Sequence, residues 1–396
     1  MKIQRKFWIN DMEALTYIMF ILIIIGTINI CSASLITAYT NFENPYYFLF
    51  RHLISIVIGL IAFFLSSRFN YKILASMRCE IFLILLTFLF LGLVLLVGIT
   101  INGSKRWLPL GFMQFQPSEL AKMVTIIISA SYLGKCLDKK LPITVDPRKN
   151  IIFLICIAIA AFVELQPDMG TAMIILGIPT MLYFIAGLSK KWIGIICGLG
   201  TIILAFLATF QSYRLDRLKS WYDPWSYSQD DGYQIVQSIL AIGSGEISGM
   251  GLGHGFSKYS YLPESHTDFA FAVFCQETGF IGALIIFLLL IAMAFYFIKI
   301  ALRTQDNFGK MLVCGIMLLI VGQATGNIAM VVGLIPVIGV PLPFISYGGT
   351  SLILNMTCIG LVISVARHNK KTNSTLTKKS VAYSKNKGSL SNVRVT

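Results

Sequence analysis

Long apolar segments recur along the chain, and shorter polar segments separate them. Runs of this kind with few charges are typical of helices that cross a bilayer. Several are shorter than the ~20 residues of a full crossing, so they must include polar flanking residues or lie deep inside a bundle. The predicted helices are residues 15–33, 53–65, 81–99, 120–133, 151–163, 171–186, 192–210, 269–300, 311–332 and 352–365.

The composition agrees with this pattern. Hydrophobic residues make up 56% of the 396 residues, charged residues make up 13%, and the mean hydropathy is +0.77. A soluble domain of this length would not sustain such values. The sequence therefore predicts an all-α polytopic membrane protein with about ten transmembrane helices.

The basic residues predict the orientation of these helices. If the amino terminus is cytoplasmic, most of the 32 Lys and Arg residues fall at cytoplasmic helix ends, as the positive-inside rule expects. Both termini are then cytoplasmic, and residues 211–268 form one large extracytoplasmic loop between helices 7 and 8. The net charge of +14 follows from this bias and from a basic tail, so no nucleic-acid partner is expected.

The chain divides into two parts by composition. Residues 1–368 hold all the predicted helices and are expected to form one transmembrane domain. Residues 369–396 are rich in Lys, Ser, Asn and Thr and almost lack large apolar residues. Because such a segment cannot bury a core, we expect a disordered basic cytoplasmic tail.

Titratable groups gather where the large outer loop meets the eighth helix. Glu264, His266 and Asp268 follow one another at this water-membrane boundary. Partial desolvation there changes proton affinity, which is how a carboxylate is tuned to act as a base. The alternative is a polar loop anchored at a helix mouth, since structural networks also gather charges at such places.

A second charged group enters the membrane on the fourth helix. Glu119 and Lys122 are three residues apart and so share one helix face. An ionisable pair in a span is costly unless the two groups pair or face a cavity. The sequence is consistent with a structural ion pair or with part of a polar cavity.

Residues 333–349 are rich in proline and glycine, and we call them the Pro-Gly run. This run cannot be one regular helix, although it is apolar enough to lie at membrane depth. It is either a tight turn or irregular backbone beside a wet cavity. Lys105 and Arg106 add cations at the same outer level, and cations suit a diphosphate. An enzyme using a polyprenyl-diphosphate sugar would need such cations and, because its leaving group is a weak base, a single carboxylate base.

Seven segments of the chain form a recognisable set of motifs. They are Gly-Ser-Lys-Arg-Trp at 103–107, Phe-Gln-Pro-Ser-Glu-Leu-Ala-Lys at 115–122, Gln-Pro-Asp-Met-Gly-Thr at 166–171, Gly-Tyr-Gln-Ile-Val-Gln-Ser at 232–238, Gly-Leu-Gly at 251–253, Tyr-Leu-Pro-Glu-Ser-His-Thr-Asp-Phe at 261–269 and Pro-Leu-Pro-Phe-Ile-Ser-Tyr-Gly-Gly at 341–349. Together they resemble the SEDS family (shape, elongation, division and sporulation), from about the first helix to Arg367. The segment 213–217 (Tyr-Arg-Leu-Asp-Arg), the segment 223–225 (Asp-Pro-Trp) and residues 323–327 are nearer to the division branch than to the elongation branch. The chain departs from the family pattern at Glu246, where glycine is common, and at Gln276, where an acidic residue often stands.

The resemblance implies an inverting peptidoglycan glycosyltransferase that polymerises lipid II into β-1,4 glycan strands at the outer face of the bacterial cytoplasmic membrane. It implies Asp268 as the catalytic base and a role in septal wall synthesis. It leaves the need for a divalent cation, Mg²⁺ or Mn²⁺, open. The substrate-binding residues expected from it are Arg106, Lys122, Glu119, Lys105, Trp107, Glu264, His266 and Ser346.

The resemblance also implies partners, namely a class B penicillin-binding protein transpeptidase and other membrane proteins of the division machinery. Three alternatives stay open at this point. The chain could be a lipid II flippase or another transporter, in which buried charges mark a transport path. It could also be the elongation polymerase, or a scaffold without catalysis.

Overall fold

The computed structural model describes residues 10–391, except for 102–103, 110, 112–113, 147, 197, 199, 201–211, 231 and 260. Nine of the predicted helices are confirmed within this part of the chain, and the predicted helix 192–210 lies largely outside it. The helices are α1 (Asp11–Phe42), α2 (Tyr47–Arg68), α3 (Met77–Val97), α4 (Pro117–Asp138), α5 (Ile151–Glu164), α6 (Met169–Ile185), α8 (Ser212–Tyr222), α9 (Tyr233–Ser244), α10 (Ala270–Arg303), α11 (Asn307–Met317), α12 (Gln323–Val331) and α13 (Gly349–Ser391), with a 3₁₀ turn η1 (Tyr71–Ala75) and a π-helical turn η2 (Leu318–Gly322).

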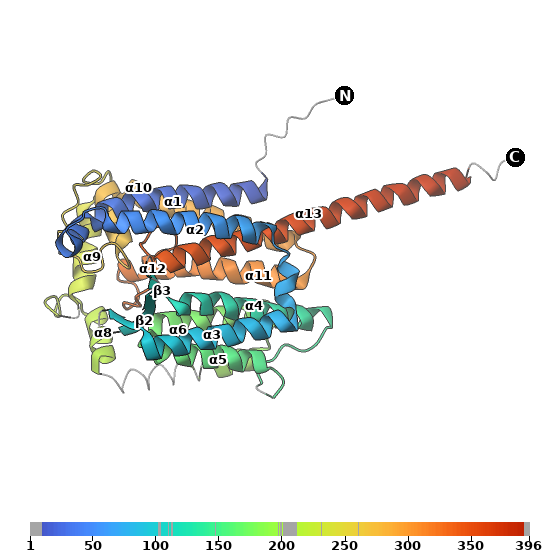
Figure 1. Ribbon diagram of the computed structural model, residues 1–396, viewed down its shortest axis with the longest axis horizontal. Coiled ribbons are helices and arrows are strands. Elements are labelled where there is room, and N and C mark those ends of the chain that lie inside the picture. Colours follow the sequence, from blue (N-terminus) through green and yellow to red (C-terminus); the bar gives the residue numbers. More distant parts are fainter. Residues whose placement is uncertain are drawn as a thin grey trace, which may run out of the picture.

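The long helices run side by side in one bundle (Figure 1). α13 packs against α2, α11 against α4, α1 against α10, and α5 against α6. The most apolar window of α4 is 72% buried, whereas those of α2 and α3 are 22% buried. α4 therefore lies inside the bundle, and α2 and α3 turn apolar side chains outward, as a surface facing lipid requires.

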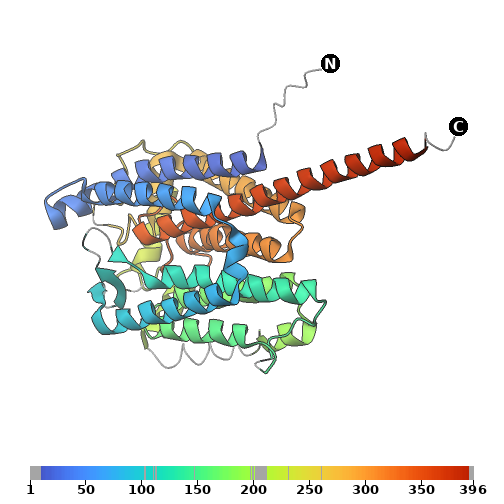
Figure 2. The same cartoon turned by 45° about the vertical axis from the view of Figure 1, so that its right-hand side comes forward.

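Both ends of the bundle can be told apart. α8, α9 and the strands lie at one end, and the start of α1 and the later part of α13 lie at the other (Figures 1 and 2). This arrangement agrees with an even number of crossings, and the assignment of that second end to the cytoplasm stays a prediction. α13 continues as helix to Ser391, beyond its apolar part at Gly349–Lys370 and through most of the segment expected to be disordered. The domain boundary after residue 368 also stays a prediction.

We call the end that carries α8, α9 and the strands the outer end. It contains elements that the apolar pattern does not predict. A small antiparallel sheet joins α3 to α4 in the order β1 (Ile99–Ile101), β2 (Ser104–Pro109) and β3 (Gln114–Phe115). Helix α3 ends at Val97, so the predicted end at residue 99 is two residues too late: Gly98 caps the helix and Ile99 begins the sheet. In the large loop, α9 buries Ile235 and Val236 on one face. These elements surround the site described below.

α10 is broken at Gly279, which has φ 66° and ψ −166°. The loop after α9 fills this break, because the amides of Met250 and Gly251 donate to the carbonyls of Gln276 and Glu277, each at 3.0 Å. A Cβ at Gly279 would lie 2.4 Å from the amide nitrogen of Gly249, so the close approach requires glycine. The outer segment of α10, residues 270–278, is thereby held by the large loop.

Glu246 occupies this same loop with φ 46°, a left-handed conformation that favours glycine. Its carbonyl accepts a hydrogen bond of 2.9 Å from the amide of Phe280. The backbone geometry at Glu246 thus accounts for the glycine that is common in the resembling family.

Candidate active site at the outer end of the bundle

Asp268 lies just before α10 and is partly buried. No hydrogen bond or ion pair reaches its carboxylate from any residue that the structure describes. Burial raises the pKa of Asp268 to about 7, and the negative charges of Glu264 and Asp168 add to the rise, while Arg106 and Arg217 oppose it. A carboxylate in this state exchanges a proton near neutral pH, as a general base must.

Arg106 and Asp168, whose charges act on Asp268, form an ion pair at the start of α6. Asp168 caps the start of α6 by accepting from the amide of Thr171 at 3.3 Å. The Nη1 atom of Arg106 lies 3.8 Å from Oδ1 of Asp168. Arg106 also donates to the carbonyl oxygens of Gln166, at 3.3 Å, and of Pro167. The sheet thus brings Arg106 to the turn before α6, so the motifs at 103–107 and 166–171 meet.

Lys105 and Trp107 flank Arg106 on β2 and are paired with Thr100 and Ile99 across the sheet. Neighbouring side chains of a strand point to opposite faces. Lys105 and Trp107 are therefore expected on the face away from Asp168, and Lys105 is exposed. No contact of the described residues joins either side chain to Asp268, so their substrate-binding role stays a prediction.

Two side chains of α12 connect Asp268 to the Pro-Gly run. Nδ2 of Asn327 donates to the backbone carbonyls of Asp268 and of Val340, each at 2.7 Å. One turn earlier, Nε2 of Gln323 donates to the carbonyl of Pro341 at 2.9 Å. The sequence analysis used these amides only to place the chain within a family. Gln323 and Asn327 lie on one face of a helix that directly precedes irregular backbone. This position indicates that their amides bind the carbonyls of that backbone.

Glu119 and Lys122 form a buried ion pair of 2.7 Å on α4. Their relative exposures are 5% and 1%. Nζ of Lys122 also donates to Oε1 of Gln323 at 2.9 Å. The pair is therefore linked through α12 to the Pro-Gly run, and its contacts are those of an ion pair inside the protein.

The other predicted residues near Asp268 shape its loop. His266 packs against the rings of Phe48 and Tyr347, with centroids 4.5 and 5.9 Å away, and burial lowers its pKa. The carboxylate of Glu264 accepts from the hydroxyl of Thr267 at 2.5 Å. Oγ of Ser346, in the Pro-Gly run, accepts from a backbone amide in the same run at 3.0 Å. The structure brings all three to the outer end, in supporting contacts.

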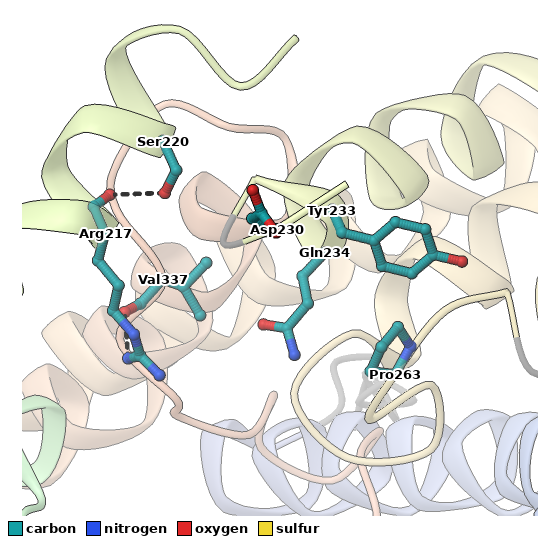
Figure 3. A pocket seen from close by; sticks show the side chains of 7 residues that line it. All are labelled: Arg217, Ser220, Asp230, Tyr233, Gln234, Pro263 and Val337. Atoms are coloured by element: carbon teal, nitrogen blue, oxygen red, sulfur yellow. Dashed lines mark hydrogen bonds between the residues drawn. The ribbon is translucent and has the colours of Figure 1, made fainter. Parts of the chain in front are cut away.

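A cavity of about 270 Å³ lies among α8, α9 and the Pro-Gly run (Figure 3). We call it the outer-loop cavity. Nη1 of Arg217 donates to the carbonyl of Val337 at 3.3 Å along its wall. The lining residues are Arg217, Ser220, Asp230, Tyr233, Gln234, Pro263 and Val337.

A second buried ion pair, which the sequence analysis missed, holds the large loop. Nζ of Lys258 lies 2.9 Å from Oε1 of Glu277, and Ser32 of α1 donates to the same oxygen at 2.6 Å. Lys258 also donates to the carbonyl of Gly253 at 2.7 Å. The signal was Glu277 itself, because a carboxylate within an apolar run must find a partner.

In the part of the chain that the structure describes, no three His, Cys, Asp or Glu side chains gather in a way that could hold a metal ion. A requirement for a divalent cation therefore stays open. The positive charges near Asp268 come from arginine side chains.

Known proteins resemble the chain over most of its length. Residues 12–371 match the family model FTSW_RODA_SPOVE, described as cell cycle protein. A probable peptidoglycan glycosyltransferase FtsW of Coxiella burnetii is 35% identical over 354 residues, covering 87% of this chain and 93% of that protein. Stage V sporulation protein E of Bacillus subtilis is 35% identical over 358 residues, covering 90% and 97%.

Solved structures share the fold. A chain of a peptidoglycan synthase complex that coordinates polymerization and crosslinking superimposes with a TM-score of 0.72 at 26% identity, covering 90% of this chain and 97% of that chain. The rod shape determining protein RodA of Thermus thermophilus gives a TM-score of 0.65 at 26% identity, covering 90% and 96%.

Proposed function

The chain belongs to the FTSW_RODA_SPOVE family of cell cycle proteins, and we propose that it is a peptidoglycan glycosyltransferase that polymerises lipid II into β-1,4 glycan strands. The observation that carries the proposal is the carboxylate of Asp268, which pairs with none of the described residues and whose pKa is raised to about 7, with the charges of two arginines acting on it. Relatives that are about 35% identical to this chain are named probable peptidoglycan glycosyltransferases, which supports the reaction class.

In the proposed reaction Asp268 takes the proton of the acceptor sugar's 4-hydroxyl. The oxygen then attacks the anomeric carbon of the donor, and the bond from that carbon to the polyprenyl diphosphate breaks with inversion. The leaving diphosphate carries the electron pair away, and a nearby cation stabilises its charge. Arg106 is the cation that the contacts favour, because it is bound to the turn that holds Asp168 and acts on Asp268.

Lys122 and Glu119 act as positioning residues in this proposal. Gln323 accepts a hydrogen bond from Lys122 and donates one to the carbonyl of Pro341 in the Pro-Gly run. Asn327 donates to the carbonyl of Val340 in the same run and to the backbone carbonyl of Asp268. A base held by its backbone keeps its carboxylate free for the acceptor. Such preorganisation is what a catalytic group needs.

The protein is an integral membrane protein with several apolar helices. We propose that it works at the division septum of the bacterial cytoplasmic membrane, and the description of its family as cell cycle protein supports a role in division. A partner transpeptidase is proposed because a structural neighbour belongs to a complex that couples polymerization to crosslinking. Co-purification from detergent should recover a class B penicillin-binding protein, and recovery of no transpeptidase would count against this partner.

The test of the function is turnover by the purified protein on fluorescent lipid II, read as glycan ladders on a gel. Lengthening glycans are expected. Movement of labelled lipid II between vesicle leaflets without any ladder would instead identify a flippase. If the protein shows neither activity, a scaffold without catalysis is the interpretation that remains.

A further inference from the structure

We propose that the outer-loop cavity binds one N-acetylated sugar ring of the acceptor substrate, next to the hydroxyl that Asp268 deprotonates. This inference rests on the proposed function and adds a substrate subsite to it.

Three of the residues that line the cavity relate it to Asp268. Pro263 belongs to the same loop as Asp268, five positions earlier. Val337 belongs to the run that continues to Gly339, where a Cβ would lie 3.6 Å from Oδ2 of Asp268. Arg217 lines the cavity, and its charge acts on the Asp268 carboxylate. A ligand in the cavity would therefore extend toward the proposed base.

The charges of the cavity fit a neutral polyhydroxyl ligand. Among the described residues that line it, Arg217 is a cation and Asp230 is an anion. A diphosphate would meet the Asp230 carboxylate, and like charges at close range disfavour binding. Sugar hydroxyls can donate to Asp230 and accept from Arg217, so both charges are used.

Gln234 supplies a free amide to the same space. Figure 3 shows its side chain projecting between Arg217 and Pro263. None of the residues that the structure describes forms a hydrogen bond with this amide, although Gln234 is half-buried. An amide with both a donor and an acceptor matches the N-acetyl group or a pair of ring hydroxyls.

The volume of the cavity matches one sugar ring. Pockets for drug-sized ligands run to ~300–1,000 Å³. The outer-loop cavity, at about 270 Å³, lies just below that range and suits a single sugar rather than a disaccharide. Pro263 and Val337 give it apolar surface for the C–H face of a ring. The acceptor is favoured over the donor because the acceptor sugar carries the hydroxyl nearest the base.

The decisive variant is Gln234→Leu, which keeps the approximate size of the side chain and removes its hydrogen bonds. Gln237→Leu is the matched control, since Gln237 lies on the same helix, is half-buried and does not line the cavity. Both proteins are first checked by thermal melting in detergent. Binding of fluorescent lipid II and of undecaprenyl diphosphate is then measured in the Asp268→Asn background, so that no turnover interferes.

We expect Gln234→Leu to weaken lipid II binding by about three- to tenfold, the loss of one or two neutral hydrogen bonds. Binding of undecaprenyl diphosphate, which has no sugar, should stay unchanged. In the otherwise native protein the same variant should raise the KM for lipid II with little change in kcat. Gln237→Leu should change none of these values.

Equal lipid II binding by the two leucine variants would overturn the subsite. Equal weakening of lipid II and of undecaprenyl diphosphate would overturn the assignment to sugar. If the native protein makes no glycan, the proposed function fails, and a sugar-dependent binding loss in Gln234→Leu would still support the subsite. If glycan is made but Gln234 has no effect, the subsite fails and the function stands.

Discussion

Two carboxylates flank the outer segment of α10, and their surroundings are opposite. Glu277, at the break, is 2% exposed and receives Lys258 at 2.9 Å and Ser32 at 2.6 Å. Asp268, at the other end, receives no side-chain donor among the described residues, and burial raises its pKa to about 7. One end of the segment is fixed by a satisfied charge. The other end keeps an unsatisfied charge, which is the state that chemistry can use.

Removing the partner of Glu277 should have the largest effect on stability. Lys258→Met leaves a buried carboxylate unpaired, which costs roughly 3–5 kcal/mol of the free energy of unfolding. The melting temperature in detergent should fall clearly. The matched control is Lys219→Met, because the Lys219–Asp216 pair is exposed and such pairs contribute about 0–1 kcal/mol. Equal melting of the two variants would show that the Glu277 pair does not hold the fold.

The pair on α4 sharpens the comparison, because it is also buried but is linked to the site. Lys122→Met alone should lower stability by a similar roughly 3–5 kcal/mol. The double variant Lys122→Met/Glu119→Leu should recover much of that stability, since replacing both charges is often neutral, yet stay poor in polymerisation because Gln323 loses its partner. Lys258→Met/Glu277→Leu should recover both properties. Melting and glycan ladders measured on all four variants test this.

Two outcomes would count against that distinction. Full polymerisation by the α4 double variant would mean that the pair is structural and does not position the site. A Lys122→Met protein that melts normally and makes no glycan would instead favour the interpretation in which Lys122 faces the substrate.

The amide of Asn327 should have a smaller effect, limited to the Asp268 end. Asn327→Leu removes two hydrogen bonds to backbone carbonyls, and each is worth about 0.5–1.5 kcal/mol. We expect a moderate fall in kcat with lipid II binding preserved. Thr325→Val on the exposed side of the same helix is the control. A kcat equal to that of the control would remove Asn327 from the positioning residues.

The pH dependence of stability tests the Asp268 end of the segment by itself. Because the folded-state pKa of Asp268, about 7, lies above the ordinary value of 3.8, the folded protein binds the proton more tightly than the unfolded chain. Asp268 therefore costs stability progressively as pH rises from about 4 to 7. Asp268→Asn should melt higher than the native protein at pH 8, and the difference should shrink toward pH 4. A difference independent of pH would contradict the raised pKa.

The sequence predicted the helices well because apolar runs are a local signal. It did not predict the sheet at 99–115 or the helices of the large loop, which are short and depend on their neighbours. At the site, the charge of Arg106 acts on Asp268, and the roles of both residues stay predictions. The sequence marks Glu277 and the amides of α12 as groups that need partners, but it does not identify the partners. The contacts of Asn327 with Asp268, and of Lys258 with Glu277 and Ser32, join distant positions, so only the fold shows which residues meet.

The central claim is that Asp268 is the general base, and the variant Asp268→Asn tests it most directly. Purified Asp268→Asn protein should bind lipid II normally and polymerise it at a rate lower by at least the ~10²–10⁴-fold that general base catalysis contributes. Glu264→Gln and His266→Ala, which change supporting contacts of the same loop, should reduce the rate less. Near-normal glycan ladders from Asp268→Asn would contradict the account and would move the base to Glu264 or to another outer carboxylate.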